Sequence, residues 1–127
     1  MSHRINWVGN NPHIAFYGTI DTNKFIFVRN LFISDKRFDL MNYQLWDFRH
    51  ANAAKLSKVD ISVLAALDIS SSIWNKEMMI AFIATEPNII DLFTSYIRAM
   101  EESPWSIKLF DCEKDAQNWC LSREIDK

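Results

Sequence analysis

The stretch Met78–Thr85, MMIAFIAT, carries no charged residue and does not alternate between apolar and polar positions. A strand with one solvent-facing side would alternate. The pattern therefore predicts a strand covered on both faces, as in the middle of a parallel sheet. Thr85-Glu86-Pro87 follows and is typical of a helix start, with proline in the first turn. A buried strand that leads into a helix is the unit of an α/β fold.

The first fifth of the chain alternates in two stretches, Arg4–Val8 and His13–Ile20, around a turn at Asn10-Asn11-Pro12. This predicts a β-hairpin. Asp21 is placed to cap a helix over Thr22–Ser34. Helical spacing predicts a core stripe on that helix, formed by Phe25, Phe27, Val28, Leu31 and Phe32. Ile26 and Ile33 fall together on another face, beside Arg29.

Further strands are predicted at Tyr43–Arg49 and Ser106–Asp111, with a polar, Ala-rich loop over His50–Lys58. Helices are predicted over Ile61–Ser70, capped by Ser57 or Asp60, and over Pro87–Met100. Asp111 is placed to cap a final helix, whose apolar stripe would be Cys112, Ala116, Trp119 and Cys120. The order β-β-α-β-α-β-α-β-α has no linker or repeat. It predicts a single α/β domain over residues 1–127 with a mixed, mostly parallel sheet.

Composition narrows the classes of function. Hydrophobic residues make up 49% of the chain, enough for a packed core, and the net charge of −2 comes with no basic block, which argues against nucleic acid as a partner. On one helix Cys112 and Cys120 would lie about 12 Å apart, too far to form a disulfide. We expect no metal and no cofactor. The N-terminus has no apolar signal segment, so we expect a cytoplasmic protein.

Three stretches resemble a known family. They are WDFR at Trp46–Arg49, the apolar strand Met78–Thr85, and IKLFDCEKDAQNWCL at Ile107–Leu121. The order of elements looks like the STAS fold of the sporulation anti-sigma factor antagonist SpoIIAA. The stretches are more similar to the SpoIIAA-like family, which is related in shape to CRAL-TRIO lipid carriers. This resemblance implies parallel strands that follow sequence order.

Strand order has a consequence for the two faces of the sheet. Right-handed crossovers that always step the same way put their helices on one face. The other face would then present aromatic and polar side chains together, namely Gln44, Trp46, Phe48, Lys108 and Phe110. That composition suits a protein interface, so we expect a homodimer formed through this face.

Titratable residues fall where parallel strands are predicted to end: Asp21, Arg49-His50, Glu86 and Asp111. Ligands of open α/β sheets bind outside those ends, and a carboxylate beside a histidine can do acid–base chemistry. Helix capping explains Asp21 and Asp111 better than catalysis does, and Glu86 favours a helix N-terminus electrostatically. The chain also has no GxSxG, P-loop or HExxH pattern. We therefore expect a non-enzymatic protein. A small hydrolase or isomerase that uses Asp47, Arg49 and His50 is a third hypothesis.

The stretch Asp60–Leu64 resembles the STAS phosphoacceptor motif Asp-Ser-Ser-Gly-Leu, with Ser62 at the phosphorylated serine. Ile61 and Val63 depart from the motif, and the missing glycine removes room for a kinase or partner. We interpret Ser62 as an ordinary serine at a helix start. A protein-partner switch resembling the STAS antagonists, with Ser62 as its phosphoacceptor, is the alternative function.

Apolar residues off the core face of Thr22–Ser34, with Lys24, Arg29, Lys36 and Arg37 nearby, suit a helix at a membrane surface. The resemblance to CRAL-TRIO carriers also implies an apolar ligand. The leading hypothesis is a non-enzymatic domain that binds an apolar or lipid-like molecule beneath this helix and associates peripherally with membranes. The expected binding residues are Phe25, Ile26, Arg29, Phe32, Ile33, Trp46 and Trp74.

Overall fold

The computed structural model describes residues 2–125 of the chain. The N-terminal hairpin consists of β1 (Ser2–Val8) and β2 (Asn11–Thr19), paired antiparallel. Gly9 makes the turn with a φ of +62°, a left-handed conformation that glycine adopts without steric cost. The hairpin predicted from alternation is therefore confirmed.

The other three strands are β3 (Tyr43–Asn52), β4 (Met79–Ile83) and β5 (Ser106–Phe110). The sheet has the order β1-β2-β3-β4-β5, and all pairs after the hairpin are parallel. This confirms the mixed, mostly parallel sheet in sequence order. All five residues of β4 are buried, as its unbroken apolar pattern predicted. β3 extends three residues beyond its predicted end, so His50–Asn52 belong to the strand.

One irregularity interrupts the pairing of β2 with β3. Ala15 pairs with Asp47 and Tyr17 pairs with His50, so Phe48 and Arg49 together lie opposite Phe16. Such a β-bulge shifts the alternation of side chains by one residue. Phe48 and Ala51 consequently point into the same core, although they are three residues apart.

The helices are α1 (Thr22–Ile33), α2 (Lys58–Ser71), α3 (Pro87–Ala99) and α4 (Glu113–Ile125), with a short 3-10 turn, η1, at Phe38–Leu40. The carboxylate of Asp21 accepts hydrogen bonds from the backbone of α1, and Glu86 does the same for α3. Ser57 and Asp60 form a capping box on α2. The cap predicted at Asp21 is confirmed, and Glu86, predicted at the start of a helix, proves to be its cap. α2 begins three residues earlier than predicted.

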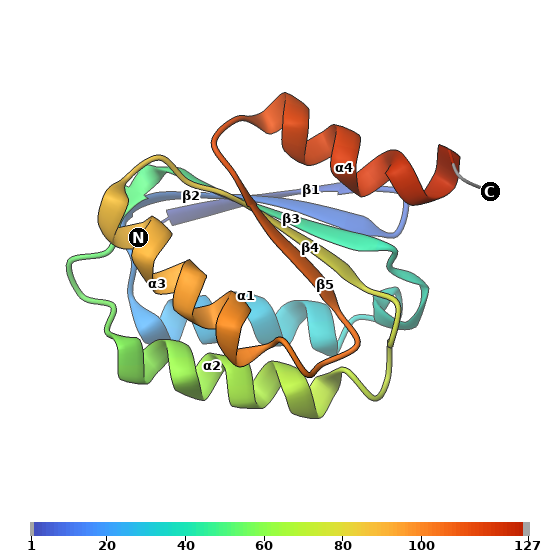
Figure 1. The fold of residues 1–127 in the computed structure, drawn as a ribbon, viewed down its shortest axis with the longest axis horizontal. Coiled ribbons are helices and arrows are strands. Elements are labelled where there is room, and N and C mark those ends of the chain that lie inside the picture. Colours follow the sequence, from blue (N-terminus) through green and yellow to red (C-terminus); the bar gives the residue numbers. More distant parts are fainter. Residues whose placement is uncertain (1, 126–127) are drawn as a thin grey trace.

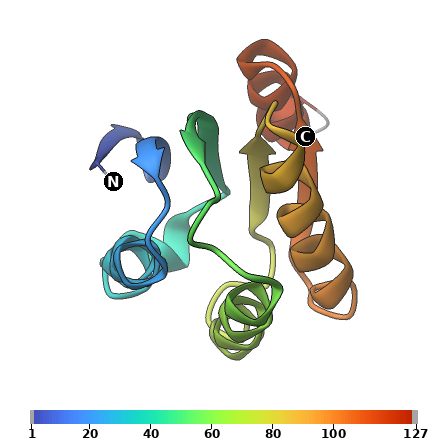
Figure 2. The same cartoon turned by 90° about the vertical axis from the view of Figure 1, so that its left-hand side faces the viewer.

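Helices cover both faces of the sheet (Figures 1 and 2). α1, α2 and α3 lie on one face, and α4 lies on the other, packed mainly over β3, β4 and β5. The crossover helices share a face because each must return the chain to the next parallel strand. α4 follows the last strand and has no such constraint. The prediction of a face without helices is therefore wrong.

Two cores result, one on each side of the sheet. Gln44, Trp46 and Phe48 point toward the three-helix side, where Trp46 is 3% and Phe48 0% exposed. Phe110 lies on the opposite side against Trp119, and Lys108 shares that face by alternation. The proposed self-association surface thus combined residues from two faces and does not exist. A homodimer stays a prediction, without this surface to support it.

The core face of α1 also differs from the predicted stripe. Its buried residues are Phe25, Val28, Arg29 and Phe32, whereas Phe27 is 59% and Leu31 41% exposed. Burial of Arg29 is the reason: the stripe is rotated toward α2, where the guanidinium has a partner. In the final helix, Ala116 and Cys120 are buried as predicted.

Candidate functional site

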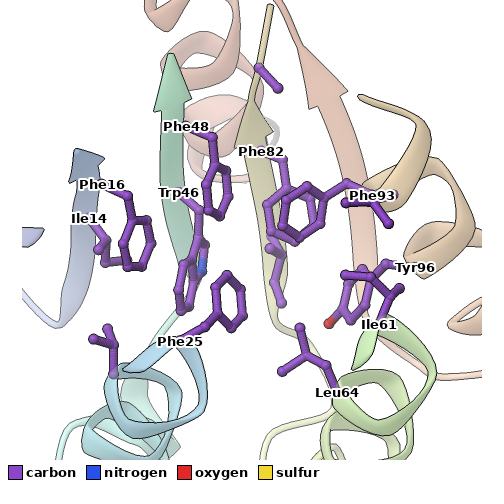
Figure 3. Packing of buried hydrophobic residues seen from close by; sticks show 14 of the residues in the cluster. Ile14, Phe16, Phe25, Trp46, Phe48, Ile61, Leu64, Phe82, Phe93 and Tyr96 are labelled. Carbon is purple, nitrogen blue, oxygen red and sulfur yellow. The ribbon is translucent and has the colours of Figure 1, made fainter. Parts of the chain in front are cut away.

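A small, partly enclosed cavity between α1, α2, α3 and the sheet lies where the sequence predicted a ligand. Its wall is aromatic and aliphatic, as Figure 3 shows for Phe25, Trp46, Leu64, Phe82 and Tyr96. Phe25 stacks on Trp46, with ring centroids 5.2 Å apart. The free volume is about 10 Å³, close to the minimum for one water molecule. In this closed form the cavity is too small for a lipid.

A buried ion pair forms the polar part of the cavity wall. Arg29 Nε donates to Asp68 Oδ1 at 2.5 Å, and both side chains are only 8% exposed. Tyr96 donates its hydroxyl proton to Asp68 Oδ2 at 2.5 Å. Arg29 also donates to Asn30 and to Ser71 Oγ. The guanidinium thereby ties α1 to α2, and the carboxylate ties α2 to α3.

Burial sets the electrostatics of this cluster. It raises the pKa of Asp68 above its usual value, and the charge of Arg29 opposes that effect. Burial also raises the pKa of Tyr96 well above 10.0, and the neighbouring Asp68 adds to the rise. Tyr96 is therefore a neutral hydrogen-bond donor at physiological pH, and the three groups form a satisfied network with no proton poised for transfer.

Of the seven residues predicted to bind a ligand, Phe25, Arg29, Ile33 and Trp46 line the cavity. Phe32 lies behind it, edge-on to both Trp7 and Trp46. Ile26 is half-buried on the side of α1 that carries Arg29. Trp74 is 69% exposed after the end of α2 and does not line the cavity. The structure thus brings together most of the set, but not Trp74.

Sequence reasoning missed Asp68, Tyr96 and Gln44. A signal for Asp68 was present, because it falls on the same helical stripe as Ile61, Leu64 and Ala65. A carboxylate within an apolar stripe requires a buried partner. Arg29, the cation beside the unexplained Ile26 and Ile33, was that partner.

The outer surface of the helical layer is apolar in places. α1 exposes Phe27 and Leu31, and α2 exposes Val59, Val63 and Leu67 at intervals of four residues. Two of the basic residues expected beside this apolar surface are buried or have partners within the protein. Arg29 is buried, and Arg37 stacks on Trp7 and pairs with Asp35. The side chains of Lys24 and Lys36 are exposed to solvent.

Ser62 is exposed, and its hydroxyl donates to the carbonyl of Lys58 at 3.1 Å. Because α2 starts at Lys58, Ser62 lies in the second turn of the helix. The prediction of a serine at the helix start is therefore wrong. The backbone N–H groups that favour a phosphate at a helix N-terminus are one turn away.

The residues of the hydrolase hypothesis do not form a carboxylate–histidine pair. Asp47 is paired with Arg49, whose Nη2 lies 2.7 Å from Oδ2, and His50 stacks on Tyr17. Near the start of α4, Asp111, Cys112 and Asp115 bring three potential ligand atoms within 4.8 Å of one another. They are exposed or half-buried, and exposed acidic groups are common without a metal ion.

An open, sequentially ordered sheet with crossover helices on one face is the architecture of an α/β domain. No protein-family model matches the chain, and no curated protein matches it either. Among solved structures, it is similar to an uncharacterized DUF3478-family protein from Shewanella loihica PV-4 that has a SpoIIAA-like fold. The TM-score is 0.54 at 14% identity, over 94% of this chain and 92% of that one. The fold of this protein is SpoIIAA-like.

Proposed function

We propose that this protein is a non-enzymatic binding domain that takes up an apolar or lipid-like molecule between α1, α2 and the sheet. The observation that carries the proposal is the partly enclosed cavity, lined by Phe25, Ile33, Trp46 and Leu64 beneath a helix that also exposes apolar side chains. Pockets of this composition, with few convergent polar groups, are typical of sites for small molecules.

Uptake requires α1 to move away from α2, because the closed cavity holds only about 10 Å³. The hydrogen bonds from Arg29 to Asp68 and Ser71 connect the two helices and would open in that movement. A ligand with a carboxylate or hydroxyl at one end would replace them, since Arg29 offers several donors in a fixed geometry. The bound molecule is therefore expected to have an apolar body and one polar end.

Native mass spectrometry with added oleate tests ligand binding. Ile33→Trp would fill the cavity, so this variant should lose the oleate adduct that the wild type retains. Leu121→Trp is the matched control, because Leu121 is exposed on α4, on the other side of the sheet. If oleate binds Ile33→Trp as well as it binds the wild type, the site is not this cavity.

The proposal includes peripheral contact with a membrane through Phe27 and Leu31, next to Lys24 and Lys36. No helix in the described residues is long and apolar enough to cross a membrane. A small apolar patch with two nearby cations binds anionic membranes weakly. Phe27→Asp with Leu31→Asp should reduce co-sedimentation with phosphatidylglycerol vesicles, whereas Leu121→Asp should not. Absence of wild-type binding at low salt would refute the membrane contact.

A protein-partner switch of the STAS kind remains the second candidate. Its support is the exposed apolar row Val59, Val63 and Leu67 beside Ser62 on α2, a surface suited to a protein partner. A phosphorylated species in native mass spectrometry of freshly purified protein, absent in Ser62→Ala, would favour this function. Ser62→Asp should leave the fold stable, because the side chain is exposed.

A further inference from the structure

A groove with charged side chains in its walls lies on the α4 side of the sheet, away from the cavity. α4 packs mainly over β3, β4 and β5 and lies away from β1 and β2 (Figure 2). The groove has a volume of about 160 Å³, comparable to the roughly 150 Å³ that accommodates benzene. The lining residues used below are Arg4, Asn6, His13, Ala15, Asp47 and Glu113.

Strand register places two opposite charges across the floor of the groove. Arg4 of β1 pairs with Ala15 of β2, and Ala15 pairs with Asp47 of β3. Neighbouring strands lie about 4.8 Å apart, so the backbones of Arg4 and Asp47 are separated by about 10 Å. The methyl group of Ala15 lies between them and leaves the space above it open.

The wall formed by β3 and α4 is net negative. Arg49 binds Asp47 through two hydrogen bonds of 3.0 and 2.7 Å and approaches Glu113 at 3.4 Å. One guanidinium thus faces two carboxylates, which leaves one negative charge in excess. Asp47 Oδ1 also accepts a hydrogen bond from the backbone N–H of Arg49. Asp47 Oδ2 and the two Glu113 oxygens accept one bond each and retain a lone pair for another donor.

The wall formed by β1 is positive. Arg4 is exposed and makes no ion pair within residues 2–122. Asn6 lies beside it on the same face, opposite His13. Burial lowers the pKa of His13, although Glu113 opposes this effect, so the imidazole is neutral at pH 7. Its Nε2 lies 3.0 Å from the hydroxyl of Tyr43. The groove as a whole is therefore uncharged but strongly dipolar.

We propose that this groove binds a small zwitterion of the α-amino-acid class. Its carboxylate would pair with Arg4 and Asn6, and its ammonium group would bind the free lone pairs of Asp47 and Glu113. The space above Ala15 suits a molecule of about six heavy atoms, which is the size of alanine, because a benzene-sized volume holds that number. An anion alone would leave the excess carboxylate unpaired, and a cation alone would leave Arg4 unpaired.

An NMR titration with L-alanine tests the proposal, with backbone amide shifts as the readout. L-Alanine should shift His13, Ala15 and Asp47. N-acetyl-L-alanine, which lacks the cation, and L-alaninamide, which lacks the anion, should each bind about tenfold more weakly, because one charge-assisted bond is lost. Equal binding of N-acetyl-L-alanine would overturn the zwitterion assignment. No shifts at millimolar L-alanine would overturn the site itself.

Two variants locate the site. Arg4→Gln should weaken L-alanine binding about tenfold, whereas Lys36→Gln, the same change at another exposed cation, should not. Ala15→Leu fills the floor and should abolish binding while the thermal unfolding temperature confirms a folded protein. Unchanged affinity in Arg4→Gln would contradict the proposal even if Ala15→Leu failed to fold.

Discussion

Replacing Arg29 by methionine should expose how far this fold depends on one buried ion pair. Methionine keeps most of the aliphatic volume but removes the guanidinium that donates to Asp68, Asn30 and Ser71. The Asp68 side chain is 8% exposed and would retain only the hydroxyl of Tyr96 as a partner. A buried carboxylate without its cation is one of the most costly defects in a protein core.

Removal of one partner from a buried ion pair costs about 3–5 kcal/mol of unfolding free energy. Typical domains have about 5–15 kcal/mol in total, so Arg29→Met should lose a large fraction of the stability. The triple variant Arg29→Met, Asp68→Leu and Tyr96→Phe removes the whole network and leaves no unpaired group. Its stability should lie near that of the wild type, or above it by about 1–4 kcal/mol.

Urea unfolding followed by circular dichroism measures these differences. An unchanged slope of the unfolding free energy against urea concentration would show that the variants expose the same surface on unfolding as the wild type. Burial raises the pKa of Asp68 in the folded protein, and loss of Arg29 raises it further. The folded variant therefore binds a proton at Asp68 more tightly than the unfolded chain does, and its stability deficit should grow as the pH rises above 3.8. If Arg29→Met lowers the unfolding free energy by less than about 1 kcal/mol, this reasoning is refuted, because that is less than a buried hydrogen-bond network typically contributes.

Two further predictions concern single side chains. Burial lowers the pKa of His13 below 6.5 in the folded protein, so the unfolded chain binds more protons than the folded protein as the pH falls. The stability of the wild type should therefore decrease from pH 7 to pH 5 more steeply than the stability of His13→Gln. Urea unfolding at both pH values measures this difference. Burial raises the pKa of Cys120 to about 12, and the residue is only 2% exposed. Iodoacetamide should therefore label the half-buried Cys112 before Cys120, which mass spectrometry of the peptides would show. Faster labelling of Cys120 would contradict its burial.

Local patterns predicted the elements of this fold well. The unbroken apolar run gave β4, the two alternating stretches gave the hairpin, and Asp21 and Glu86 mark the starts of α1 and α3. These features depend on neighbours within a few residues, which is the range over which periodicity and capping act. Resemblance then supplied the strand order, which residue patterns alone do not contain.

Features that depend on distant partners could not be predicted in the same way. Arg29 is polar by type but buried because Asp68, 39 residues away, compensates its charge. That pair turns α1, so Phe27 and Leu31 become exposed instead of Ile33. The face of the sheet on which α4 lies could not be predicted either, because no later strand constrains the position of a final helix. The groove beside α4 follows from that placement and was missed with it.

The bulge in β3 has a consequence for comparing this sequence with others. A strand normally keeps one set of positions facing inward, yet here Gln44, Trp46 and Phe48 are followed by Ala51. A related chain that lacked one residue near Arg49 would close the bulge and restore regular alternation, while its counterparts of His50 and Ala51 would stay opposite Tyr17 and Gly18 on their present faces. An alignment gap of a single position in this strand would therefore mark the loss of the bulge alone, whereas a chain of unchanged length without the bulge would carry its counterpart of His50 on the core face.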